Sequence, residues 1–381
     1  MSSISLNTRF HNNSIYSVQT LIAGLLFCTV SMIGCSNSDD SVTSPPQQQI
    51  KNPRDYSWTI DTLYFTPAPQ APGQTILQDL WGINDTIVYV GCHDAWGGNG
   101  ALWKFNGKCW ERVKLGVWEG GPLTEAYDIR AITGSSPTDI YAFGSYELSN
   151  DNPPPNYLFK VFAVHFNGTA WHEISLPQGQ YIFDVNHDSP TIIYGGGSYG
   201  QLFKFDGVRW TVDTVQTPAS SDIWMTIKVI GAAADSGVFI QIRQHNQKTG
   251  AQSNELAIYA KKRMTRLAYT GEDIPWGGDA FWKSKEGNIY SCGWNGVFRI
   301  SGTKWSQIKV TYSYVRSIWG TNDKHIFVCE DNDISFFDGS TWSILNTGIS
   351  TKYYISKLWC SANEVFVAFS DGQRTYILHG K

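Results

Sequence analysis

Charged residues and paired cysteines are scarce in this sequence of 381 residues. Charged side chains make up 16%, with 29 Lys and Arg against 33 Asp and Glu, and the basic residues form no block. Nucleic-acid recognition needs clustered cations, so we expect no DNA or RNA partner. The 7 cysteines include no CxxC spacing, which argues against a zinc site and against a disulfide framework. We therefore expect no metal and no cofactor.

Aromatic residues and glycine, in contrast, are abundant. The chain has 16 Trp, 19 Tyr, 19 Phe and 36 Gly beside only 4 Met, and 42% of its residues are hydrophobic. Aromatic residues favour strands and glycines favour tight turns, so this balance favours strands over helices. The composition predicts a globular all-β chain with a large core.

The first part of the chain indicates export. Residues 18–34 are apolar, follow Arg9 and His11, and end in small residues before Cys35, as a secretory signal does. The stretch Met32-Ile33-Gly34-Cys35 resembles the lipobox of bacterial lipoproteins, in which the cysteine is acylated and becomes the new N-terminus. An uncleaved membrane anchor over residues 18–34 is the alternative.

The lipobox resemblance implies a signal peptide over residues 1–34 and lipidation at Cys35. A flexible tether over residues 35–52 follows, because this stretch is rich in Ser, Pro and Gln. Asp39 and Asp40 resemble the acidic export signal of some Bacteroidetes-type lipoproteins, although a solvated linker would hold such acids too. We expect a lipid-anchored protein of the cell envelope, on the outer membrane, facing the periplasm or the cell exterior.

A repeat organises the rest of the chain, residues 53–381. Its mark is a turn between two aromatic or apolar positions, found in five copies: FNGKCW at 105–110, FNGTAW at 166–171, FDGVRW at 205–210, ISGTKW at 300–305 and FDGSTW at 337–342. Asn-Gly and Asp-Gly accept positive φ in two-residue hairpins, so each copy predicts a strand, a tight turn and a strand beginning near Trp. A second pair of strands precedes each copy.

Four antiparallel strands in about 40 residues are typical of a β-propeller blade. The long interval between Trp210 and Trp305 predicts one further blade at 223–269, and the last repeat ends without its outer strand. We expect residues 56–60 to supply that strand, with Tyr56, Trp58 and Ile60 buried on one face. The sequence thus predicts a seven-bladed propeller whose ring is closed by the N-terminal strand on the C-terminal blade.

The repeats resemble those of secreted bacterial β-propeller lipoproteins, a kelch-like and galactose-oxidase-like group often labelled glucosyltransferase. The resemblance lies in stretches such as LWGINDTIVYVG at 80–91 and IWGTNDKHIFVC at 318–329, each followed by the aromatic-flanked turn. It implies the fold and leaves the function open, because propellers host enzymes and binding scaffolds alike. No nucleotide-sugar motif supports the glucosyltransferase label.

Aligning the blades places one residue of each innermost strand at a common level, namely Trp81, Thr133, Asn186, Ile230, Trp282, Trp319 and Trp359. We interpret these tryptophans as wedges between neighbouring blades. Three positions earlier lie residues that could rim the central channel: Gln78, Arg130, Phe183, Asp279, Arg316 and Ser356. Pairing of Asp279 with Arg130 or Arg316 is the equally weighted alternative.

The long connections between strands all fall on one face of the predicted ring, at 93–100, 116–127, 145–158, 243–255 and 269–278. Long loops on a rigid scaffold are where binding usually occurs. With the channel rim, they supply the candidate binding residues His93, Asp94, Trp96, Trp118, Glu119, Arg130, Tyr146, Trp276, Asp279 and Arg316. Aromatic planes beside carboxylates suit a glycan, and the same side chains suit a protein partner.

Our hypothesis is a non-enzymatic binding or scaffold module that holds a glycan or a cell-envelope protein through its long-loop face. We assign no catalytic residue and expect a monomer. The alternative is a carbohydrate-active enzyme, a hydrolase, lyase or glycosyltransferase-labelled protein that uses the loop carboxylates. A hydrolase would need two carboxyl groups about 5–10 Å apart across a cleft.

Overall fold

The computed structural model describes residues 51–64, 75–93, 100–149, 157–177, 179, 181–189, 191–233, 237–270, 277–301, 304–348 and 355–381. The predicted signal peptide, Cys35 and most of the predicted tether lie outside these ranges. Residues 49–381 form one compact unit, and all the elements below belong to it. No helix within the described ranges is long and apolar enough to span a membrane.

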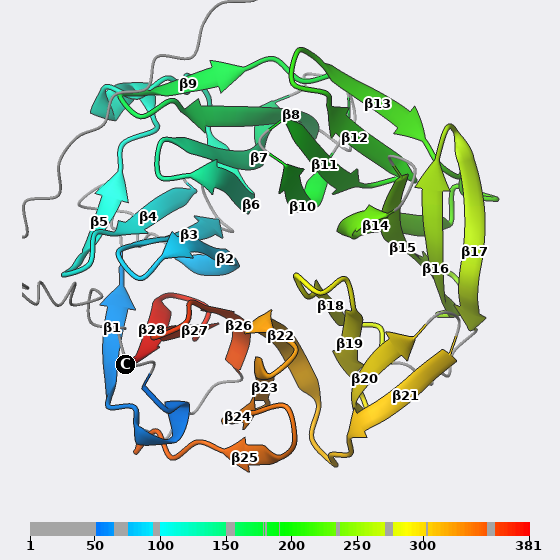
Figure 1. Cartoon of the computed structure of the whole chain (residues 1–381). Coiled ribbons are helices and arrows are strands. Elements are labelled where there is room, and N and C mark those ends of the chain that lie inside the picture. The colour runs from blue at the N-terminus through cyan, green and yellow to red at the C-terminus, as the bar shows by residue number, and fades with distance from the viewer. Residues whose placement is uncertain are drawn as a thin grey trace, which may run out of the picture. The chain divides into compact units, whose positions relative to one another are not determined.

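The unit is a ring of seven four-stranded antiparallel sheets, each a blade (Figure 1). Blades 1 to 3 contain β2 (Ile76–Asn84), β3 (Ile87–His93), β4 (Ala101–Phe105) and β5 (Trp110–Val113); β6 (Tyr127–Ser136), β7 (Asp139–Ser149), β8 (Tyr157–Phe166) and β9 (Trp171–Ile174); and β10 (Ile182–Ser189), β11 (Ile192–Gly197), β12 (Gln201–Phe205) and β13 (Trp210–Thr214).

Blades 4 to 7 continue the ring in chain order. They contain β14 (Ile223–Ala233), β15 (Gly237–Asn246), β16 (Gln252–Ala260) and β17 (Arg263–Thr270); β18 (Ala280–Lys283), β19 (Ile289–Gly293), β20 (Gly296–Ser301) and β21 (Lys304–Lys309); β22 (Val315–Asn322), β23 (His325–Glu330), β24 (Asp333–Phe337) and β25 (Trp342–Ile344); and β26 (Ile355–Cys360), β27 (Val365–Ser370), β28 (Thr375–Gly380) and β1 (Trp58–Leu63). The predicted fold and the blade at 223–269 are confirmed.

Ring closure occurs where predicted, because β1 pairs with β28 from Trp58 opposite Gly380 to Leu63 opposite Thr375. The amides of Ser57 and Lys381 extend this ladder by donating to each other's carbonyls at 2.9 and 3.0 Å. The expected burial of Ile60 is wrong, since its side chain is 45% exposed. The expected burial of Tyr56 is confirmed, because Tyr56 packs in the core between blades 6 and 7, and Trp58 is half-buried against the same core. Leu63, three residues beyond Ile60 and on the opposite face of the strand, is buried in the core between blades 7 and 1.

The aromatic-flanked turns differ in detail from the predicted two-residue hairpins. Phe105 pairs with Trp110, so four residues form the connection. Only the glycine has positive φ, which is 89° at Gly107. The Asn106 side chain accepts hydrogen bonds from the amides of Lys108 and Cys109, both at 3.0 Å. The asparagine or aspartate therefore caps the turn with its side chain rather than adopting the left-handed backbone.

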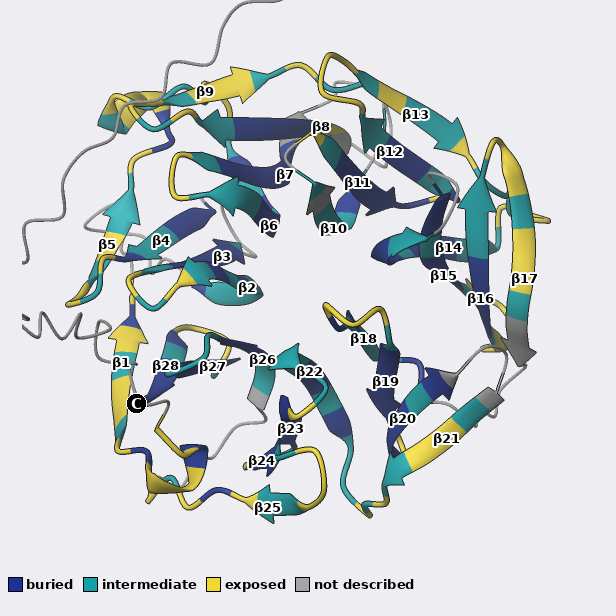
Figure 2. Ribbon diagram, viewed as in Figure 1, coloured by how far each residue is buried: buried dark blue, intermediate teal, exposed yellow. Residues whose placement is uncertain are grey.

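The core lies between adjacent blades, and the inner strands are more buried than the outer ones (Figure 2). Tryptophans of the predicted level cover glycines of the next blade. A methyl group on Gly82 would lie 2.9 Å from the Trp359 ring, one on Gly134 would lie 2.9 Å from Trp81, and one on Gly320 would lie 2.8 Å from Trp282. This contact explains the recurring Trp-Gly pair and confirms that these tryptophans wedge between blades.

Five cysteines fall within the described ranges, and none of them forms a disulfide. Cys292, Cys329 and Cys360 are buried and behave as small apolar residues. They contribute to the apolar packing of blades 5 to 7.

We predict that Gly82→Ala destabilises the propeller by about 1–3 kcal/mol, because the new methyl group must displace the Trp359 ring. Urea unfolding followed by tryptophan fluorescence measures the change. Gly195→Ala is the matched control, since a methyl group there would meet its nearest side chain at 3.4 Å, an ordinary contact. Equal stability losses in the two variants would contradict the wedge.

Candidate functional site

The channel at the centre of the ring holds a cavity of about 340 Å³. Its walls come from the inner strands, chiefly of blades 1 to 6, with two residues of β26. In five blades a bulge interrupts the inner pair of strands near the long-loop face, at Gln78, Arg130, Phe183, Arg316 and Ser356. Of these predicted rim residues, only Phe183 lines the cavity.

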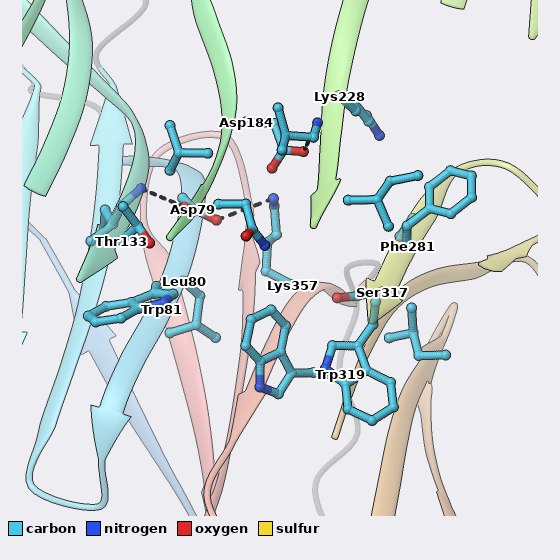
Figure 3. Close-up of a pocket in the computed structure, with 18 of the residues that line it drawn as sticks. Asp79, Leu80, Trp81, Thr133, Asp184, Lys228, Phe281, Ser317, Trp319 and Lys357 are labelled. Atoms are coloured by element: carbon cyan, nitrogen blue, oxygen red, sulfur yellow. Dashed lines mark hydrogen bonds and ion pairs between the residues drawn. The ribbon is translucent and has the colours of Figure 1, made fainter. Parts of the chain in front are cut away.

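In these five blades the residue after the bulge belongs to a level that we call the charged level, and blades 4 and 5 contribute the residues aligned with it. It consists of Asp79, Ala131, Asp184, Lys228, Ala280, Ser317 and Lys357, one from each blade in order. Figure 3 shows Asp79, Asp184, Lys228 and Lys357 at one end of the cavity and Trp81 and Trp319 at the other. The charged level therefore lies between the long-loop face and the tryptophan level.

Side chains of the charged level join neighbouring blades. Asp79 Oδ2 accepts a hydrogen bond from the Ile132 amide at 2.9 Å, and Asp184 Oδ2 accepts one from the Val229 amide at 3.0 Å. Ser317 Oγ accepts the equivalent bond from the Leu358 amide at 3.2 Å. An oxygen at this position thus accepts a hydrogen bond from an amide of the next inner strand.

The charges of this level are unevenly distributed around the channel. The acids come from blades 1 and 3 and the lysines from blades 4 and 7. Lys357 Nζ lies 3.4 Å from Asp79 Oδ1, forming an ion pair. Lys228 Nζ instead donates to the backbone carbonyl of Asp279 at 2.6 Å. The channel therefore has an acidic half and a basic half.

Burial shifts the ionisation of these groups. It raises the pKa of Asp184 to about 6, although Lys228 and Lys357 oppose the shift. Burial also lowers the pKa of Lys228, and the nearby Asp184 only partly offsets this. For Lys357, burial lowers the pKa but Asp79 and Asp184 raise it, and the net direction is upward. Asp184 and Lys228 are thus the two groups whose charged forms are disfavoured.

A second layer surrounds the mouth of the channel on the long-loop face. We call it the mouth belt, defined as Arg130, Tyr181, Phe183, Trp224, Arg243, Asp279, Tyr314 and Arg316. These residues lie at or near the starts of β6, β10, β14, β18 and β22, except Arg243, which lies near the end of β15. The belt therefore spans blades 2 to 6.

The first part of the belt is built around Arg130. Its Nη2 donates to Asp128 Oδ2 at 2.9 Å and its Nε donates to Ser145 Oγ at 3.4 Å. The guanidinium lies 5.0 Å from the Tyr181 ring centroid, within cation–π range. Tyr181 stacks on Phe183 at 5.5 Å. Hydrogen bonds and aromatic faces together fix the arginine in place.

Trp224 follows in blade 4 and joins this aromatic cluster. Its ring lies 6.4 Å from Tyr181 and 5.4 Å from Tyr199. A surface pocket of about 280 Å³ opens on its other side, lined by Trp224, Thr226, Arg243, His245 and Gln252. Arg243 Nη1 is 3.8 Å from Asp279 Oδ1 at the edge of blade 5.

The last part of the belt repeats the arrangement of arginine, aromatic ring and carboxylate. The Arg316 guanidinium lies 4.9 Å from the Tyr314 ring centroid and its Nη2 is 3.4 Å from Asp331 Oδ1. Burial, together with a hydrogen bond to Asp279, raises the pKa of the Tyr314 hydroxyl. Trp294 packs edge-on against Tyr314 at 5.0 Å and remains 64% exposed.

Four of the predicted site residues fall in or beside this belt. Arg130, Asp279 and Arg316 belong to it, and His93 Nδ1 lies 3.9 Å from Asp128 Oδ1 next to Arg130. Arg130 forms an ion pair with Asp128 and Arg316 forms one with Asp331, while Asp279 faces Arg243.

Asp94, Trp96 and Trp276 are outside the described ranges. Glu119 pairs with Arg112, and Trp118 is half exposed and stacks on Tyr127 at 6.1 Å.

Tyr146 is 2% exposed and stacks on Phe162 inside blade 2. It is buried because strands extend into the segment 145–158, which was expected to be a loop: β7 reaches Ser149 and β8 starts at Tyr157. The segment 243–255 is likewise mostly strand, since β15 reaches Asn246 and β16 starts at Gln252.

Sequence reasoning missed Trp224, Arg243 and the charged level. The alignment that placed the tryptophan level also placed Asp79, Asp184, Lys228 and Lys357 two positions earlier, so a signal was present. Residues two apart in a strand share a face, whereas the rim was sought three positions away. The bulge lies between these two positions and shifts the register there, so the residue three positions before the tryptophan level belongs to the mouth and the residue two positions before it belongs to the channel.

No family model and no curated sequence matches this chain. Among solved structures it is similar to "YCF48 bound to D1 peptide", with a TM-score of 0.55 and 10% identity over 86% of this chain and 97% of that one. The WD40 domain of Pan2 from Neurospora crassa has a TM-score of 0.55 and 11% identity over 87% and 97%. The extracellular domain of BT4673 from B. thetaiotaomicron has a TM-score of 0.50 and 10% identity over 83% and 40%.

These likenesses establish a propeller fold. At such identities they establish no more than the fold, so the function must be argued from the belt and the channel. The described residues contain no group of three or more His, Cys, Asp or Glu side chains that could hold a metal ion.

We predict that Asp184→Asn stabilises the protein near neutral pH. The folded-state pKa of Asp184, about 6, lies above the ordinary 3.8, so this group's contribution to stability is complete below pH 4 and is lost as the pH rises through 6. Each unit of difference between the two pKa values lowers the free energy of unfolding at neutral pH by about 1.4 kcal/mol, so ionisation of Asp184 costs roughly 3 kcal/mol in total. Asparagine avoids ionisation and keeps an oxygen for the Val229 amide.

Urea unfolding at pH 4, 5, 6 and 7.5 measures this effect. The variant should gain stability over the parent from pH 4 to 7.5, whereas Asp333→Asn, at an exposed position of β24, should follow the parent. A stability difference that does not change with pH would contradict the assignment.

Proposed function

We propose that this protein is a non-catalytic binding module that holds a protein partner against its mouth belt. The observation that carries the proposal is the belt itself, in which Arg130 and Arg316 each lie over aromatic rings and are held by carboxylates. Arginine, tyrosine and tryptophan are the side chains that most often dominate protein interfaces.

Preorganisation supports this interpretation. A flexible arginine loses side-chain entropy when it binds, and an arginine already held by hydrogen bonds and a ring loses less. Arg130 is fixed by Asp128, Ser145 and Tyr181 on strands that belong to a closed ring. A partner would therefore meet a surface whose anchors are already in position.

The structural likenesses supply a precedent. YCF48, a propeller of similar fold, was solved bound to the D1 peptide. Binding of a peptide by a propeller is thus compatible with this architecture, and the belt is where this chain carries suitable side chains.

A glycan is the second candidate for the same face. The pocket beside Trp224 combines an aromatic wall with Thr226, His245 and Gln252, whose polar groups suit sugar hydroxyls. The belt extends over five blades whereas this pocket occupies one, so we favour the protein partner.

We predict that Trp224→Ala raises the dissociation constant of belt-binding peptides at least tenfold, because loss of an aromatic anchor usually costs 2 kcal/mol or more, roughly 30-fold. Peptides would be selected from a random display library on residues 49–381 and then measured by biolayer interferometry. Arg243→Met serves as a second belt variant. Val208→Ala, 88% exposed in the turn between β12 and β13 on the opposite face, is the control.

Selected peptides that bind Trp224→Ala and Val208→Ala equally well would refute the belt as their site. If no peptide is selected, and a glycan array instead gives binding that Trp224→Ala abolishes, the glycan replaces the protein partner.

We also propose that Cys35 carries a lipid that anchors the protein in the cell envelope, as the lipobox resemblance implies. Multiple acyl chains hold a protein on a bilayer, since each buried methylene contributes about 0.8 kcal/mol. We predict that Cys35→Ser moves the protein from the membrane to the soluble fraction and abolishes labelling by a clickable fatty acid. Cys28→Ser is the control and should change neither. Retention of Cys35→Ser in the membrane fraction would favour an uncleaved anchor at 18–34.

A further inference from the structure

The cavity between the charged level and the tryptophan level has features that the mouth belt does not explain. It is lined by acidic, basic and aromatic side chains from different blades. Its volume, about 340 Å³, falls in the range of small-molecule sites. The inference drawn from it is independent of the proposed partner at the mouth.

The hydrogen bond that joins Asp184 to the next blade does not require the charge of Asp184. Its bond to the Val229 amide is the same joint that Ser317 makes with the Leu358 amide in blade 6 without any charge. Burial meanwhile disfavours the ionised form. A carboxylate at this place therefore weakens the fold, where a hydroxyl would have sufficed.

Asp184 and Lys228 also keep unused hydrogen-bonding capacity. Within the described residues Asp184 accepts one hydrogen bond, whereas a carboxylate has about four acceptor positions. Lys228 donates one, to the Asp279 carbonyl, whereas an ammonium carries three N–H groups. Asp79 and Lys357, in contrast, are paired with each other. Asp184 and Lys228, on neighbouring blades, are thus an acceptor and a donor with capacity for a ligand.

The surroundings leave space for that ligand. At the charged level, blade 5 carries Ala280, a small side chain that lines the cavity. Trp81, Trp282 and Trp319 form the opposite end of the cavity and offer apolar surface. A bound molecule would therefore meet charge at one end and aromatic rings at the other.

We propose that this cavity binds a free α-amino acid, with the ligand ammonium on Asp184 and the ligand carboxylate on Lys228. A zwitterion matches the acidic and basic halves of the channel, and it neutralises both groups whose charges burial disfavours. The side chain of the amino acid lies against the tryptophan level. A neutral polyol would leave both charges uncompensated.

Isothermal titration calorimetry tests the proposal on residues 49–381, which contain every blade and the closing strand. Each standard α-amino acid is the probe, and every binder is compared with its N-acetyl derivative and its α-carboxamide. We expect at least one amino acid to bind with 1:1 stoichiometry and each derivative to bind at least tenfold more weakly, because each lacks one of the two charges.

Two variants identify the site. Asp184→Asn keeps the acceptor for Val229 but removes the charge, and it should weaken binding tenfold or more. Lys228→Met should do the same, and Lys248→Met, which removes an exposed lysine from the same blade, should bind as the parent does. If Lys228→Met does not fold, Asp184→Asn and the two ligand derivatives still decide the matter.

Failure of every amino acid to bind at millimolar concentration would overturn the proposal. Equal affinity for the parent amino acid and its derivatives would also overturn it, as would binding that is unchanged in Asp184→Asn. Among the described residues Trp224 does not line the cavity, so Trp224→Ala should leave amino-acid affinity intact, which keeps this result separate from peptide binding at the mouth.

Discussion

The pairing of β1 with β28 is the interaction on which the channel depends. It joins residues more than 300 positions apart, and loop closure over that length costs on the order of 5 kcal/mol. Burial of Tyr56 and Leu63 stabilises the closed ring by about 1.5–3 kcal/mol each, which offsets much of this cost. The backbone hydrogen bonds between β1 and β28 stabilise it further. Closure brings blade 7 against blade 1, and only then does Lys357 reach Asp79. The enclosed channel and its shifted pKa values are consequences of that ring.

Equivalent positions of the repeat separate what the fold requires from what it permits. At the tryptophan level, an aromatic ring in one blade and a glycine in the next are needed together, because the ring occupies the space of a Cβ. At the charged level, an uncharged oxygen is enough to accept the hydrogen bond from an amide of the neighbouring blade, and Ser317 provides that oxygen in blade 6. The differences among Asp, Ala, Lys and Ser at this level are therefore not set by the joint between blades.

Much of the architecture could be predicted from the sequence, because the repeated turn motif marks the outer strands and its spacing gives the blade count. The closing strand and the burial of Tyr56 were also predictable, but the exposure of Ile60 was not: β1 is an outer strand, and the middle of that strand faces solvent. The rim was predicted only in part. Arg130, Asp279 and Arg316 were found by alignment, whereas Trp224 and Arg243 come from a degenerate blade that lacks the turn motif.

Asp279 connects the two layers of the site. Its carboxylate faces Arg243 in the mouth belt, while its backbone carbonyl accepts the hydrogen bond from Lys228 in the channel. A substitution at this residue would disturb the side chain in one layer and, through any backbone shift, the lysine in the other. Trp224 packs against the ring of Phe183 at 6.5 Å, next to Asp184 in the chain, whereas the Asp184 carboxylate itself bonds to the Val229 amide. Changes at these two positions can therefore assign binding to the mouth or to the channel, which a change at Asp279 cannot do.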